Sequence, residues 1–117
     1  MIGFIRACGA AALTLGFLPA GQAQGDPGYD WSVIGTNVIA MEVTYMPDRI
    51  LFAVEGNAGS CGSGTWLTYE GSQSDNAARQ ANVKAVYAAL VAAKTTGTPI
   101  RIYGRNSGCK AIFFYLG

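Results

Sequence analysis

The sequence predicts a mainly β domain that contains a single helix, and three observations support this class. Alternation of apolar and polar residues, which is typical of strands, occurs in three segments up to Tyr69 and in two segments from Pro99 onward. One long segment between them has the period of a helix. Glycine and proline residues separate the segments. The order of three strands, a helix and two strands is that of a five-stranded Greek-key barrel of the OB type.

The five predicted strands cover residues 37–45, 50–56, 65–69, 99–104 and 111–117. Ile39, Met41, Val43 and Tyr45 form the apolar side of the first strand, and Ile50, Phe52 and Val54 form that of the second. Residues 46–49 suit a tight turn, so these two strands are predicted to form a hairpin. Residues 24–32 are rich in turn formers and are predicted to form a surface arm. An open antiparallel sheet with the helix on one face has the same element order and is the alternative to a closed barrel.

The predicted helix runs from Asp75 to Lys94. Its apolar positions have the spacing of one helical face: Val83, Val86, Tyr87 and Leu90. Ser74 or Asp75 is a suitable N-cap, because a short polar side chain can accept a hydrogen bond from the first turn. Gly97, followed by Pro99, ends the helix.

The first 23 residues are predicted to be a secretory signal peptide. Arg6 precedes an apolar run over residues 7–18, and the small residues Gly21 and Ala23 then form a cleavage pattern. The run is shorter than the roughly 20 apolar residues that a membrane-spanning helix needs. Residues 24–117 would then form a single secreted or periplasmic domain.

Composition excludes several classes of function. The eight basic and seven acidic residues nearly balance, and cleavage would remove Arg6 and leave seven of each. A near-neutral domain is poorly suited to nucleic acid, which needs an excess of Lys and Arg. The sequence has no histidine, which excludes a Ser-His-Asp triad, a Cys-His pair and the usual catalytic zinc site. We therefore expect no enzyme activity, no metal and no cofactor.

Two cysteines remain after the predicted cleavage, Cys61 and Cys109, and export would take them into an oxidising compartment. We therefore expect a disulfide between them. The glycine- and serine-rich segment around Cys61 lacks the glycine that a nucleophile elbow needs at that position, and it is interpreted as a flexible loop. Trp66 is expected to pack over the disulfide, whereas Trp31 falls in the predicted arm.

Several polar and aromatic residues have the chemistry of a sugar-binding site. Tyr103 is the best single candidate, because Ile100 and Ile102 take the core side of its strand and direct Tyr103 outward. The other candidates are Thr36, Asn37, Arg105 and Asn106. Such residues are also common at exposed strand ends, so a purely structural role is the alternative. The strand glutamates are interpreted as solvated or ion-paired residues rather than as a catalytic pair: Glu42, Glu55 and Glu70.

Two segments resemble a known family. Lys94–Gly104, with the sequence KTTGTPIRIYG, and Phe52–Gly56, with the sequence FAVEG, resemble the receptor-binding B subunits of the subtilase cytotoxin and pertussis-like AB5 toxins. The resemblance implies an OB-like barrel, assembled as a ring of five, that binds sialylated glycans on host cells and has no catalytic activity. It also implies an enzymatic A subunit as a partner.

The resemblance also implies where the sugar binds. It matches Thr36, next to Asn37, to a hydroxyl residue near the start of the first strand, and Tyr103 to a tyrosine of the Arg-Ile-Tyr strand. Gly104 stands where the subtilase relative has a second aromatic residue. The competing interpretation is a periplasmic or extracellular protein-interaction module on the same barrel, such as an inhibitor or an assembly subunit.

Overall fold

The structure is a computed structural model and describes residues 28–117. The predicted signal peptide and the beginning of the predicted arm lie outside the described residues. The elements are β1 (Trp31–Thr36), β2 (Val38–Glu42), β3 (Ile50–Val54), β4 (Leu67–Tyr69), α2 (Asn76–Thr96), β5 (Ile100–Arg105), the 3-10 turn η4 (Ser107–Cys109) and β6 (Lys110–Leu116). No helix within this part of the chain has the length and apolar character needed to cross a membrane.

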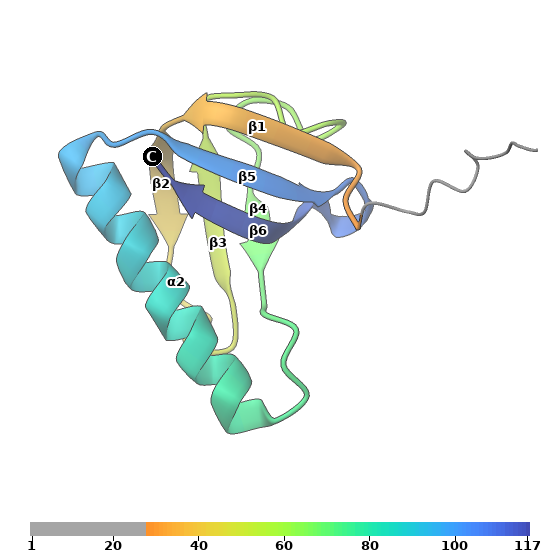
Figure 1. The fold of residues 1–117 in the computed structure, drawn as a ribbon, viewed down its shortest axis with the longest axis vertical. Helices are drawn as coiled ribbons and strands as arrows, with labels where there is room; N and C mark the ends of the chain where they lie inside the picture. Colours follow the sequence, from red (N-terminus) through yellow and green to blue (C-terminus); the bar gives the residue numbers. More distant parts are fainter. Residues whose placement is uncertain (1–27) are drawn as a thin grey trace, which may run out of the picture.

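The strands form one curled, mixed sheet, so the prediction of a mainly β domain with one helix is confirmed. The strand order is β1-β5-β6-β4-β3-β2, and all neighbours are antiparallel except β4 and β6. In Figure 1 the strands β1, β5 and β6 cross the direction of β2, β3 and β4, which gives the sheet the shape of a half-barrel. Helix α2 runs along one side of it.

The sheet has six strands, one more than predicted. The additional strand is β1, which begins at Trp31, inside the segment predicted to be a surface arm. It pairs antiparallel with β5, so that Trp31 lies opposite Gly104 and Val33 opposite Ile102. Burial of Trp31 and Val33 explains why this segment forms a strand despite its turn-rich beginning.

The core lies between the inner side of the sheet and α2. Most of its large, fully buried side chains come from β3, β5 and α2: Ile50, Phe52, Val54, Ile100, Ile102, Val83 and Leu90. β5 buries alternate residues, as expected for a sheet with one buried side, whereas β3 also buries the small residue Ala53 between Phe52 and Val54. The predicted apolar sides of the second and fourth strands are therefore confirmed.

The predicted apolar side of the first strand is wrong in part. Val38 is buried, whereas Ile39, Val43 and Tyr45 are each about half exposed. The pairing of β2 with β3 shifts register between Val38 and Ala40, and β2 ends at Glu42. A one-residue shift exchanges the two sides of a strand, which explains the difference.

The caps of helix α2 are those that its sequence predicts. The Asp75 carboxylate accepts a hydrogen bond from the Ala78 N–H at 2.8 Å, which makes Asp75 the N-cap. Gly97 has a φ of 71° in the left-handed region, and its N–H donates to the Ala93 carbonyl oxygen. The helix buries Val83 and Leu90 as expected and runs past Lys94 to Thr96.

The predicted disulfide between Cys61 and Cys109 is present. It joins the loop before β4 to the start of β6, across a separation of 48 residues. The expected roles of the two tryptophans are reversed. Trp66 is 46% exposed, whereas Trp31 is only 5% exposed and belongs to the same core cluster as Cys61. Trp31 is buried because β1 carries it onto the inner side of the sheet beside β5.

Candidate ligand-binding site

The outer side of β5 and β6 carries a cluster of aromatic side chains, named here the aromatic face. Its members are Tyr29, Tyr103, Phe113 and Tyr115, and together they line an open hollow of about 340 Å³. Ile100 and Ile102 are buried, so Tyr103 points to the opposite side of β5, as predicted.

Tyr103 is the centre of the aromatic face. Its ring centroid lies 4.9 Å from that of Tyr29, 5.6 Å from that of Tyr115 and 6.4 Å from that of Phe113, each in an edge-to-face arrangement. Phe113 pairs directly with Tyr103 across β5 and β6. Aromatic side chains on neighbouring strands attract one another in this arrangement, and these contacts fix the orientation of the rings. Phe113 and Tyr115 are nevertheless 44% and 52% exposed, so the cluster remains open to solvent.

Ser32 adds a hydroxyl group to this surface. It is the β1 partner of Tyr103 and is exposed. A sugar offers apolar C–H groups on its ring faces and hydroxyl groups around its rim. Aromatic rings beside a hydroxyl side chain therefore suit the binding of a sugar in a shallow, open site.

Gly104 is required by packing. A Cβ atom at this position would lie 2.2 Å from the Lys110 carbonyl oxygen and 2.3 Å from Cζ2 of Trp31. No side chain fits there without movement of β6 or of the indole ring. The chain therefore cannot place a second aromatic residue at this position, and Phe113 and Tyr115 stand beside Tyr103 instead.

Thr36 and Asn37 do not lie beside Tyr103. Thr36 is 4% exposed, and its hydroxyl oxygen accepts a hydrogen bond from the Gly56 N–H at 2.9 Å. It pairs with Ile100 at the beginning of β5, whereas Tyr103 pairs with Ser32. Asn37 donates from Nδ2 to the Glu55 carboxylate at 3.5 Å. The structure therefore places both residues in contacts between β1, β2 and the end of β3.

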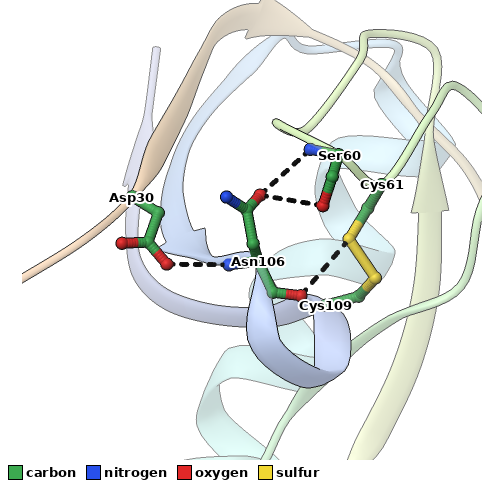
Figure 2. Close-up of a disulfide and its surroundings, with 5 residues drawn as sticks. All are labelled: Asp30, Ser60, Cys61, Asn106 and Cys109. Atoms are coloured by element: carbon green, nitrogen blue, oxygen red, sulfur yellow. Dashed lines mark hydrogen bonds between the residues drawn. A yellow bond between two sulfur atoms is a disulfide. The ribbon is translucent and has the colours of Figure 1, made fainter.

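Arg105 points outward from β5, but it lies in a polar network at the edge of the aromatic face. Its guanidinium group is 3.4 Å from the Asp30 carboxylate, which also accepts a hydrogen bond from the Asn106 N–H at 3.0 Å. The Asn106 side-chain oxygen accepts hydrogen bonds from the N–H and hydroxyl groups of Ser60 (Figure 2). This network joins the beginning of β1 to the disulfide loop.

The disulfide itself is part of this region. The Cys61 sulfur lies 3.9 Å from the Asn106 carbonyl oxygen (Figure 2). A disulfide sulfur carries no hydrogen, so we treat this as a packing contact rather than a hydrogen bond. The side-chain oxygen and the N–H of Asn106, one of the candidate sugar contacts, therefore hold the loops around the disulfide together.

The strand glutamates each have a local partner. Glu42 accepts hydrogen bonds from the hydroxyl group and the N–H of Thr44, which hold the pKa of its carboxyl below the ordinary value. Glu55 contacts Asn37, and Glu70 lies 3.8 Å from Lys110. Among residues 28–117, no cluster of three His, Cys, Asp or Glu side chains could hold a metal ion.

Sequence reasoning missed three of the four members of the aromatic face: Tyr29, Phe113 and Tyr115. The alternation of the last strand contains a signal for two of them, because Phe113 and Tyr115 are two residues apart and share a side of β6. Which side they occupy depends on the pairing of β6 with β5, which the sequence does not reveal.

Comparisons with models of protein families, with curated proteins and with solved structures found no match to this chain. The function is therefore inferred from the geometry of the aromatic face and from the expected resemblance of two short segments to toxin B subunits.

Proposed function

We propose that the protein is a secreted, non-catalytic glycan-binding subunit of the kind that recognises sialylated glycans in AB5 toxins. The observation that carries this proposal is the group of three aromatic rings around Tyr103, on an open surface. Tyr103 is also the residue that the resemblance matches to a sugar contact. The aromatic face is the proposed binding site, and Thr36, Asn37 and Arg105 support the fold around it.

We also propose that the half-barrel is an OB-like barrel in which β1 and β2 are one strand bent at Asn37. Only this residue separates them, and they occupy the two opposite ends of the strand order. Counting them as one strand leaves five, with α2 between the third and the fourth. The hydrogen bond from the Glu55 N–H to the Asn37 carbonyl oxygen, at 3.1 Å, supports continued pairing through the bend.

A shallow site of this kind binds a single glycan weakly. A ring of five copies would present several sites to one cell surface, and simultaneous binding multiplies the strength of attachment by orders of magnitude. The proposed partners are therefore host cell-surface glycans, four further copies of the chain and an enzymatic A subunit. Light scattering of the purified protein tests the ring, and a monomer would contradict it.

A glycan array probed with the purified protein tests the binding function. We expect binding by the wild type and at least about a tenfold loss in Tyr103→Ala, because this change removes the central ring. Tyr45→Ala is the matched control, because Tyr45 is a half-exposed tyrosine in the turn after β2. No binding by the wild type, or equal binding by Tyr103→Ala, would contradict the proposal.

One observation favours a second function, a protein-interaction module. An exposed apolar side chain, Ile34 on β1, lies opposite Arg101 and extends the aromatic face. Contiguous apolar surface of this kind also occurs at protein interfaces. Co-purification of a single protein partner, lost in Tyr115→Ala and accompanied by no glycan binding, would support this second function over the first.

A further inference from the structure

We infer that Arg101 makes the aromatic face selective for sugars that carry an anionic group, either a carboxylate or a sulfate. This inference rests on the proposed glycan-binding function and adds a specificity-determining residue to it.

The position of Arg101 places it beside the proposed sugar. It precedes Tyr103 by two residues in β5 and therefore lies on the same side of the strand, about 7 Å away along it. Its direct neighbour on β6 is Tyr115 and its neighbour on β1 is Ile34. A pyranose ring resting on Tyr103 can extend a ring substituent over this distance.

Contacts with the aromatic face hold the Arg101 side chain in place. The guanidinium carbon lies 5.5 Å from the centroid of the Tyr115 ring, in a cation–π arrangement. Tyr115 in turn contacts Tyr103. The cation is therefore continuous with the proposed binding surface and is orientated before a ligand arrives, which lowers the entropic cost of binding.

No carboxylate neutralises Arg101 among residues 28–117. Its Nε atom is buried without a hydrogen-bond partner, and the ion pairs of this part of the chain involve other residues. Arg105, four residues later on the same side of β5, differs because it is paired with Asp30. Of these two outward arginines, Arg101 is the one whose charge the fold leaves uncompensated.

Arginine is well suited to bind a carboxylate or sulfate, because its planar guanidinium group can donate two parallel hydrogen bonds to two oxygens. A partly buried position beside aromatic rings strengthens such a contact relative to one in bulk water. A neutral sugar would occupy the aromatic face and leave Arg101 without this contact. The expected result is a preference for acidic over neutral glycans.

Paired glycans test this inference, with lactose as the neutral probe and sialyllactose, glucuronyl-lactose and lactose sulfate as the acidic probes. We expect the wild type to bind at least one acidic probe about tenfold or more tightly than lactose. Arg101→Gln should lower that affinity to the level of lactose and leave lactose binding unchanged. The three acidic probes show whether a carboxylate or a sulfate is preferred.

Lys84→Gln is the matched control, because it removes one positive charge from the exposed side of α2. It should leave both affinities and the acidic preference unchanged. Arg101→Lys keeps the charge without the two-pronged geometry and should retain part of the preference. If Arg101→Gln does not fold, Arg101→Lys still decides the question, because loss of the two-pronged geometry should weaken the acidic preference and an unchanged preference would contradict the role of Arg101.

The outcomes separate the two proposals. Binding of lactose and acidic probes with equal affinity by the wild type, or an unchanged preference in folded Arg101→Gln, would overturn the role of Arg101 and leave glycan binding standing. The absence of binding to every probe would overturn the glycan-binding function and this inference together.

Discussion

The two sides of strand β5 differ in what their side chains do. On the inner side, Ile100 and Ile102 are almost completely buried, and Gly104 lies against the Trp31 ring. On the outer side, Arg101 and Tyr103 are partly exposed and contact other exposed side chains. The same six residues therefore contribute to stability on one side and form a surface suited to recognition on the other.

Because of this difference, substitutions at neighbouring positions of β5 should have separable effects on stability and on binding. A change on the inner side should lower the free energy of unfolding, because buried groups lose close packing. A change on the outer side should alter binding with little effect on folding. Variants on the two sides of the sheet test this separation.

Removal of the disulfide should have the largest effect on stability. The Cys61→Ala/Cys109→Ala double variant should lose about 4 kcal/mol of unfolding free energy, because the bond closes a loop of 48 residues in the unfolded chain. Urea denaturation measures this loss, and reduction of the wild type should reproduce it. A loss below about 1 kcal/mol would mean that the stability of the core on the inner side of the sheet does not depend on the disulfide.

Gly104→Ala should have the next largest effect, a loss of about 2–3 kcal/mol of unfolding free energy. The added methyl group would meet the Lys110 carbonyl oxygen and the Trp31 ring at distances well below van der Waals contact. Ser32→Ala, on the outer side of the neighbouring strand, is the control and should change stability by less than about 0.5 kcal/mol. Equal stability of the two variants would contradict the proposed contrast between the sides of the sheet.

Thr36→Val should cost about 1–2 kcal/mol, because it removes the acceptor of the hydrogen bond from the Gly56 N–H in a buried setting. Thr36→Ser keeps the hydroxyl group and should cost less. Thermal or urea unfolding of the two variants measures the difference. Loss of glycan binding by Thr36→Val at unchanged stability would instead return Thr36 to the binding site.

The smallest effect is expected from Asp48, an exposed residue beside the first turns of α2. A hydrogen bond from Gln80 and the ion pair with Arg79 hold the pKa of its carboxyl below the ordinary value of 3.8. Because the folded pKa is the lower one, this contact stabilises the fold above pH 3.8, and the stabilisation is lost as the pH falls through the folded value.

Asp48→Asn should therefore be slightly less stable than the wild type near neutral pH, and the difference should shrink in acid. Melting temperatures of both proteins near neutral pH and below pH 3.8 measure this difference in stability. A difference that stays constant or grows as the pH falls would contradict the assignment of the pKa shift.

Elements with local causes could be predicted from the sequence. The bounds of α2 follow from an N-cap, a periodic apolar side and a left-handed glycine, all within a few residues of the features they explain. The outward direction of Tyr103 follows from simple alternation along one strand. The disulfide followed from having two cysteines outside the predicted leader.

Elements that depend on distant partners could not be predicted in the same way. Strand β1 and the burial of Trp31 depend on pairing with β5, about seventy residues later in the chain. The exposed side of β2 depends on a shift in register against β3. Thr36 is buried because its hydroxyl oxygen accepts a hydrogen bond from the Gly56 N–H. It therefore does not lie in the sugar site that the sequence suggested for it.

Short-range periodicity and composition therefore explain why the mainly β class, the helix, the disulfide and the outward direction of Tyr103 could be predicted from the chain alone. The tertiary structure alone decided that Phe113, Tyr115 and Tyr29 surround Tyr103, and that Arg101 rather than Arg105 keeps an uncompensated charge. The physical reason is that a binding surface is made by the register between strands. Register is fixed by packing across the whole sheet and leaves no local mark in the chain.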